Sequence, residues 1–451
     1  MYDVLFYSIL TNKYKILFFV NDKGKKVNRT LLIAMLLANS GMAFSAPNSL
    51  PIGTNIGYGD TSNSNTIYAP IANPSNNAPS VSNIDGYRFG TGISGNLFIK
   101  SNGFEGVKSY LNNEIDVILN KNIFSLLDGT ALADAFNGFM RKYQNGYIAS
   151  EGSVTIPVIL NHEYLSGGIS IDYSQQYAGK ASLVRNSDVT GIFDPLQNTI
   201  NVTKEGAGLA FQYKEMNELA VGYGWKGVII NQGSWYDGNL NFGVTARYIN
   251  MNSASAAIDF VQYTEDNLYG KNRSINDYLN GIQNGVSDSN VTADIGLDWT
   301  SENFMVSLVG KNLTSPSFEV QDQSTGYNFG IRNSYVMKPK TTMGVQWYSA
   351  NRNWTLASSI DFNESNDLND NPVQWFNATV SYATNEAWYI PDVRLGVRNN
   401  MATNGYNYIT AGITIGVLTM DLATTTTDFS GIQNNQSNEG VMASLGLEFD
   451  F

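Results

Sequence analysis

The chain of 451 residues contains no cysteine and a single histidine, His162. The lack of cysteine excludes disulfides, thiol redox chemistry and thiolate metal sites. Charged residues make up only 15% of the chain. After Ser45, no stretch approaches the roughly 18 consecutive apolar residues that a membrane-spanning helix requires. If the protein enters a membrane, it must therefore do so as strands.

Residues 1–45 are expected to form a signal peptide. Four basic residues between positions 23 and 29 precede the apolar stretch 31–44, and small residues follow it. Small side chains at the positions that a signal peptidase reads favour cleavage after Ser45. Residues 27–31 resemble a compact start of such a peptide, which favours translation from near residue 27 as an alternative start.

The chain as a whole has more acidic than basic residues, 39 against 27. Removing residues 1–45 takes away six basic and two acidic residues, which changes the net charge from −12 to −16. A protein that binds nucleic acid normally needs a basic surface to neutralise phosphates. We therefore expect no nucleic-acid partner.

Residues 46–84 are rich in Asn, Ser, Pro and Gly, and we expect them to be extended or loosely ordered. After this segment, apolar and polar residues alternate. Period-two runs recur from residue 85 to residue 451, and they predict about fourteen strands of the length that suits a tilted membrane strand. Typical runs are Val154, Ile156, Val158 and Leu160, and Leu240, Phe242, Val244, Ala246 and Tyr248.

A soluble sandwich would also alternate, so the residue types decide between the two folds. Aromatic residues such as Tyr173, Trp225 and Trp347 fall at strand ends, where a barrel places its interfacial girdles. Many residues on the opposite face are Gly, Ser, Thr, Asn, Lys or Asp, which a polar lumen accepts and a soluble core does not. The sequence thus predicts an all-β protein, a transmembrane antiparallel barrel over residues 85–451.

Residues 104–144 break the period of two. Their apolar residues have helical spacing and are divided near Asp128 and Gly129, which predicts a helical hairpin inserted after the first strand. Two locations are open: outside the barrel against its rim, or inside it as a plug that gates the lumen. The candidate plug residues are Leu111, Ile115, Phe136 and Phe139.

Several strand and turn motifs resemble one known family. They are residues 309–313 (VGKNL), 337–345 (MKPKTTMGV), 354–364 (WTLASSIDFNE), 393–400 (VRLGVRNN) and 409–416 (ITAGITIG). These segments look like successive strands of the TraF-type conjugal-transfer outer-membrane family, which is itself similar to FadL-type channels for hydrophobic solutes. The resemblance implies the fold and the bacterial outer membrane, with conjugation proteins as partners, and it carries over no catalytic or ligand-binding residue.

The closing strand carries the most specific signal. Leu445, Leu447, Phe449 and Phe451 share one phase, which resembles the terminal signal that the outer-membrane insertion machinery reads. We expect outer-membrane lipids and that machinery as partners.

Two sets of polar residues are candidates for chemical sites. His162 lies between two predicted strands without a nucleophile motif beside it, so a solvated turn residue is favoured over a catalytic base. Residues 361–370 carry four carboxylates, enough for a hard cation, but their order does not match a calcium loop. We therefore expect no enzyme activity, no cofactor and no metal.

Two functions from different classes remain. The first is a structural or assembly component connected with conjugal transfer, without transport of its own. The second is a passive channel for hydrophobic solutes, similar to FadL-type proteins, in which the hairpin and nearby aromatic residues bind the solute.

Overall fold

The structure is a computed structural model. It describes residues 56–59, 66–78, 87–103, 126–144, 146–162, 165, 167–185, 187–188, 191–194, 199–202, 207–230, 237–259, 285–322, 333–384, 389–402, 406–426 and 439–451. No helix in these ranges is long and apolar enough to cross a membrane.

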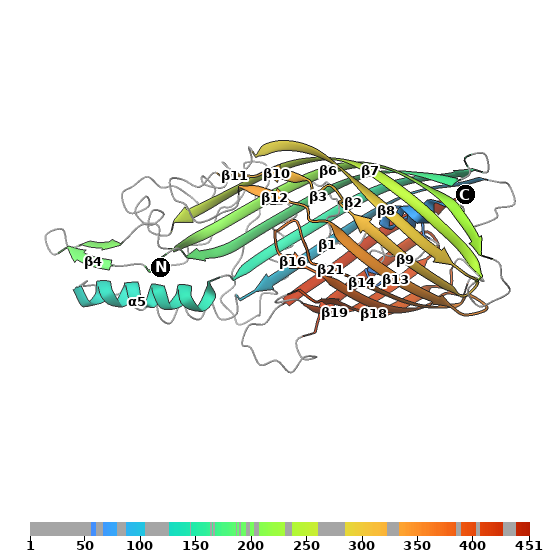
Figure 1. The fold of residues 1–451 in the computed structure, drawn as a ribbon. Helices are drawn as coiled ribbons and strands as arrows, with labels where there is room; N and C mark the ends of the chain where they lie inside the picture. Colours follow the sequence, from blue (N-terminus) through green and yellow to red (C-terminus); the bar gives the residue numbers. More distant parts are fainter. Residues whose placement is uncertain are drawn as a thin grey trace.

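Fourteen strands form a closed antiparallel barrel (Figure 1). The first and last strands pair with each other, and the pairing of the fifth strand with the sixth completes the ring. The predicted antiparallel barrel is thereby confirmed. Its strands are β1 (Tyr87–Asn102), β2 (Tyr147–His162), β3 (Gly167–Arg185), β6 (Ala207–Ile230), β7 (Gly238–Asp259), β8 (Val286–Thr300), β9 (Phe304–Lys311), β13 (Lys340–Tyr348), β14 (Trp354–Asp361), β17 (Trp375–Tyr382), β18 (Asp392–Asn400), β19 (Asn407–Ile415), β20 (Leu418–Thr425) and β21 (Glu439–Asp450).

The barrel is apolar outside and polar inside. In β2, for example, Ile156, Val158 and Leu160 are exposed, whereas Ser153 and Thr155 are buried. The same pattern in the other strands gives an outer belt of Leu, Ile, Val and aromatic side chains around a lumen that contains buried Lys, Arg, Asp and Glu. Successive side chains point to opposite faces of a strand, so the period of two in the sequence specifies both surfaces at once.

The two ends of the barrel differ. At about 3.3 Å per residue, the 24 residues of β6 reach three times as far as the eight of β14. The long strands β3, β6 and β7 project at one end, which we call the loop end, and the C-terminus lies at the other, the turn end (Figure 1). Connections at the turn end are short, such as residues 301–303 and 416–417.

One helix, α5 (Leu126–Tyr143), lies beyond the loop end beside β4 (Gly191–Asp194), which pairs with β5 (Thr199–Val202) (Figure 1). Helix α5 itself therefore lies outside the lumen, whereas residues 104–125 of the predicted hairpin lie outside the described residues. Of the candidate plug residues, Phe139 is buried with its ring 5.1 Å from that of Tyr143. Phe136 lies on the same helix, and Leu111 and Ile115 lie outside the described residues.

The N-terminal segment enters the barrel, which differs from the loosely ordered state expected for residues 46–84. Residues 56–59, α2 (Ala69–Ala72) and η2 (Pro74–Asn77) are almost entirely buried. The Ile56 amide donates to Asp421 of β20 at 3.0 Å, and the Asn77 amide group lies 2.9 Å from the Ser170 hydroxyl of β3. Irregular backbone has no periodic pattern, so packing of this kind leaves no trace in the sequence period.

Glycines in the wall make room for this segment. A Cβ atom at Gly243 of β7 would lie 2.1 Å from the carbonyl carbon of Pro74, and one at Gly296 of β8 would lie 1.9 Å from the Asn73 side chain. A larger residue at either position would push the segment off the wall. Glycine within a strand often marks such a close approach of another backbone.

The connection between β9 and β13 is a second segment that packs inside the lumen. It contains β10 (Ser317–Glu319), β11 (Gln321–Asp322) and β12 (Ser334–Val336). β11 pairs in parallel with β7, beyond the residues of β7 that pair with β8. Phe318, Tyr335 and Met337 pack with inward side chains of β6 and β7 in one buried cluster. Apolar packing thus fills part of a lumen whose wall is polar.

Candidate functional site

A short loop between β14 and β17 forms the centre of the candidate site. β15 (Ser365–Asn366) pairs with β16 (Pro372–Val373), and residues 367–371 join them; we call these five residues the crossbar. The Asp367 carboxylate accepts hydrogen bonds from the backbone and side chain of Asn371. Asp and Asn favour such turns because their short side chains bond to nearby backbone. The local sequence therefore closes the crossbar upon itself.

The crossbar spans the lumen from wall to wall. It begins and ends at β14 and β17, which are neighbours in the ring, and the strands half a ring away are β2 and β3. Its polar contacts are made with β1, β2, β3 and β6. A loop that leaves one side of the barrel and bonds to the opposite side must cross the interior.

Ion pairs attach one end of the crossbar. The Lys100 ammonium of β1 donates to the carboxylate of Asp367, and it lies 3.4 Å from the Glu151 carboxylate of β2. Asn369 of the crossbar donates to the same Glu151 carboxylate at 2.9 Å. All three charged side chains are buried. Because a buried charge is costly unless it is paired, this arrangement fixes the loop against the wall.

Two further lysines complete the attachment. The Lys214 ammonium of β6 donates to the Asp370 carboxylate at 2.6 Å and to the Leu368 carbonyl at 2.8 Å. Lys180 of β3 donates to the Asn371 side-chain oxygen at 3.0 Å. Four strands in succession around the ring, β1, β2, β3 and β6, thus each supply one charged side chain to the crossbar.

The carboxylates of residues 361–370 do not converge on a cation. Each one lies closest to a different lysine: Asp361 is 3.9 Å from Lys340, Glu364 is 3.6 Å from Lys338, Asp367 bonds to Lys100 and Asp370 bonds to Lys214. No group of metal-binding side chains occurs within the described ranges. The residues weighed as a calcium loop therefore dock the loop into the barrel instead.

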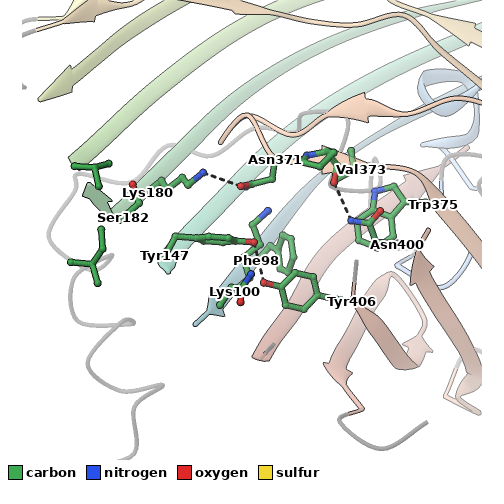
Figure 2. A pocket seen from close by; sticks show the side chains of 14 residues that line it. Phe98, Lys100, Tyr147, Lys180, Ser182, Asn371, Val373, Trp375, Asn400 and Tyr406 are labelled. Carbon is green, nitrogen blue, oxygen red and sulfur yellow. Dashed lines mark hydrogen bonds between the residues drawn. The ribbon is translucent and has the colours of Figure 1, made fainter. Parts of the chain in front are cut away.

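A cavity of about 320 Å³ lies beside the crossbar. Its walls come from β1, β2 and β3 on one side and from residues 371–373, β17 and β18 on the other (Figure 2). Aromatic side chains and amide or amine groups share the lining, among them Phe98, Tyr147, Trp375, Tyr406, Lys180, Asn371 and Asn400.

The aromatic side chains are held in place by polar contacts. The Tyr147 and Tyr406 hydroxyls lie 3.0 Å apart (Figure 2), and the Arg398 guanidinium lies 4.0 Å from the Trp375 ring centre. The Trp375 backbone amide donates to Asp361 at 2.9 Å. Fixed aromatic faces together with a few polar groups are the usual makeup of a small-molecule site. No local pattern in the sequence marks these residues as a site, because they come from strands far apart in the chain.

A second buried charged cluster lies in the wall itself. The Arg247 guanidinium of β7 is 2.7 Å from Glu218 of β6 and 3.3 Å from Asp294 of β8. It also lies 3.5 Å from the Asn312 side-chain oxygen. These groups line no part of the cavity, and they connect three neighbouring strands.

The remaining sequence candidates lie elsewhere. Leu445, Leu447, Phe449 and Phe451 are 53, 36, 41 and 68% exposed, so all four lie on the outer surface. His162 is the last residue of β2 and does not line the cavity. The insertion signal remains a prediction.

Comparison with known families identifies the class. The model of a family described as "F plasmid transfer operon, TraF, protein" matches residues 70–361. This range covers well over half of the chain, and the chain belongs to this family. The resemblance read from the strand motifs is confirmed.

Three solved structures illustrate which barrels have a similar outline. The Pseudomonas putida toluene transporter TodX is 11% identical, with a TM-score of 0.42 over 89% of this chain and 99% of its own. The Ralstonia pickettii toluene transporter TbuX is 10% identical, with a TM-score of 0.38 over 90% and 97%. A Pseudomonas aeruginosa FadL homologue is 9% identical, with a TM-score of 0.31 over 90% and 99%. Comparison with curated proteins gives no match.

Proposed function

We propose that this protein is a passive outer-membrane channel whose lumen binds a small amphipathic solute beside the crossbar. The observation that carries this proposal is the cavity of about 320 Å³ with aromatic and polar walls inside a closed barrel. A barrel with a purely structural role has no need of an aromatic cavity in its interior.

The outer surface supports the membrane location. Exposed Ile, Leu, Val and aromatic side chains surround the barrel, and each of the fourteen strands pairs with a neighbour on both sides, which closes the ring. Only closed barrels and helices satisfy all backbone polar groups in lipid. Short connections in such barrels face the periplasm and longer ones face outward, so the loop end with the cavity faces the cell exterior.

The cavity limits the solute in size and chemistry. Its volume is about twice the ~150 Å³ of a cavity that binds benzene. One aromatic ring with a short substituent therefore fits, and a much larger molecule requires the surrounding chain to move. The mixed lining favours a solute with both an apolar body and a polar group.

Solute binding to purified protein tests this proposal. We expect benzyl alcohol to bind in calorimetry, and Tyr406→Ala to weaken binding about fivefold, because a buried aromatic contact contributes about 1 kcal/mol. The matched control is Tyr389→Ala, which removes an exposed tyrosine outside the cavity lining and should leave affinity unchanged. Equal affinities for both variants, or no binding to wild type, contradict the proposal.

The family supports a second function. Its description names a plasmid transfer operon, so the barrel is also a candidate assembly component of conjugal transfer. A donor strain that lacks the protein should then lose mating efficiency. Complementation by Tyr406→Ala separates the two functions, because an assembly role does not require the cavity. Full rescue of mating by this variant favours assembly, and loss of rescue connects mating with the solute site.

A further inference from the structure

The three lysines that hold the crossbar are not equivalent. Lys100 bonds to one carboxylate and lies close to a second, and Lys214 bonds to one. Lys180 contacts only neutral groups among the described residues: the Asn371 side-chain oxygen at 3.0 Å, the Asn369 carbonyl at 3.4 Å and the Tyr147 ring, whose centre is 4.9 Å away. Lys180 is thus the crossbar lysine that lacks an ionic partner.

Lys180 lies where a ligand in the cavity can reach its ammonium group. Lys180 lines the cavity, and its ammonium points to Asn371 across it (Figure 2). Lys100 also lines the cavity, but Asp367 and Glu151 already surround its charge. An anionic group that enters the cavity therefore finds one ammonium whose present partners are neutral. A hydrogen bond between charged groups is roughly twice as strong as one between neutral groups.

We propose that the cavity selects a single-ring aromatic carboxylate and that Lys180 binds its carboxylate. This inference rests on the proposed function and deepens it, because it names the solute class. The carboxylate replaces the Asn371 amide oxygen as the partner of Lys180, while the ring packs between Tyr147, Tyr406 and Trp375. No bond to Lys100 is needed, so the ion pairs that hold Asp367 stay intact.

The charges around the cavity set the size of the preference. Around the crossbar, the charges of Lys100, Lys180 and Lys214 balance those of Glu151, Asp367 and Asp370. The buried Arg398 lies 4.0 Å from the Trp375 ring centre but does not itself line the cavity. The preference arises from the contact with Lys180 alone. We therefore expect a benzoate affinity about tenfold above that of benzyl alcohol, which equals one charge-assisted hydrogen bond of about 1.4 kcal/mol.

Calorimetry with three probes tests the inference: benzoate, its neutral counterpart benzyl alcohol, and acetate, which has the charge without the ring. Wild-type protein should bind benzoate about tenfold more tightly than benzyl alcohol and should bind acetate only weakly. Lys180→Gln should remove the benzoate preference and leave benzyl alcohol binding unchanged. Lys180→Arg keeps the positive charge and should retain most of the preference.

Two controls keep the outcomes distinct. Lys226→Gln neutralises an exposed lysine near the turn end and should change neither affinity. Heat-modifiable gel mobility shows that each variant is folded. Equal binding of benzoate and benzyl alcohol to wild type, or an unchanged preference in Lys180→Gln, overturns the inference and leaves the solute site standing. If neither ring compound binds, both the inference and the proposed function fall. If a variant does not fold, the comparison of benzoate with benzyl alcohol binding to wild-type protein still tests the inference.

Discussion

The barrel contains two buried charged clusters, and they join different parts of the structure. The Arg247 cluster connects β6, β7 and β8, which are already joined by long ladders of backbone hydrogen bonds. The crossbar cluster connects the opposite wall to a loop of five residues that has only two paired residues on each side. One cluster therefore belongs to the barrel wall, and the other holds a short loop against that wall.

This difference predicts which state each cluster stabilises. Loss of an ion pair inside the wall leaves a buried charge that the folded barrel cannot relieve without opening strands. Loss of an ion pair at the crossbar can be relieved by movement of the loop alone. Local openings cost less free energy than global unfolding, so the same type of substitution should unfold the barrel in one case and release the loop in the other.

The largest effect is expected at the wall. Arg247→Met leaves Glu218 and Asp294 buried without their cation, and breaking such a pair costs about 3–5 kcal/mol. We expect the free energy of unfolding in urea to fall by this amount, measured by heat-modifiable mobility of the folded protein in detergent. Arg352→Met, at an exposed turn residue, is the control. A loss of stability no greater than that of the control would show that the wall cluster contributes little.

The next effect is expected at the crossbar. Lys100→Met leaves two buried carboxylates facing each other, and we expect the loop to open while the barrel stays folded. Because the chain lacks cysteine, Ser365→Cys provides a unique buried thiol beside the crossbar. Its maleimide labelling should accelerate about a hundredfold in the Lys100→Met background, which corresponds to about 3 kcal/mol of lost attachment.

The matched control for this experiment is Lys338→Met, which removes an exposed ion pair with Glu364 at the base of the same loop. Labelling in that background should stay near the wild-type rate. Unfolding of the whole barrel by Lys100→Met would remove the distinction between the two clusters.

The sequence predicted the wall far better than the contents of the lumen. A strand records its two surfaces in adjacent residues, so Ile156, Val158 and Leu160 reveal the outer face without knowledge of any partner. The crossbar depends on contacts such as Lys100 with Asp367, which are 267 positions apart. Residues 361–370 display their carboxylates in the sequence but not the four lysines that lie beside them. The sequence therefore favoured a solvated surface loop and gave no sign of the ion pairs inside the barrel.

The N-terminal filling was missed for a related reason. Residues 56–59 and 66–78 are irregular, and their fit depends on glycines in distant strands, such as Gly243 and Gly296. Glycine in a strand marks a close approach but does not say which backbone approaches. The apolar spacing of residues 104–144, by contrast, is local and predicts a helical hairpin. Helix α5 covers Leu126–Tyr143 of it, and residues 104–125 lie outside the described residues.

A smaller effect is expected at Lys214. Its partner Asp370 has a side chain that is 14% exposed, so water can solvate the carboxylate when the lysine is removed. We expect Lys214→Met to cost about 1–2 kcal/mol, between the values for exposed and buried pairs. Labelling of Ser365→Cys should accelerate about fivefold to thirtyfold. A labelling rate equal to that in the Lys100→Met background would show that the burial of an ion pair does not determine how strongly it holds the crossbar.

The smallest effect is expected where the charges are exposed. At the loop end, Asp188 accepts hydrogen bonds from Arg185 of β3 and Arg141 of α5, and these bonds hold the pKa of Asp188 below its usual value. A lowered carboxyl pKa stabilises the contact above the unfolded pKa, and this stabilisation is lost only as the pH falls through the folded value. Amide exchange of α5 should therefore stay constant from pH 8 to pH 5, after correction for intrinsic rates. Asp188→Asn should raise it less than about threefold. A larger change would mean that the exposed ion pairs of Asp188, and not apolar packing around Phe139, hold α5 against the barrel.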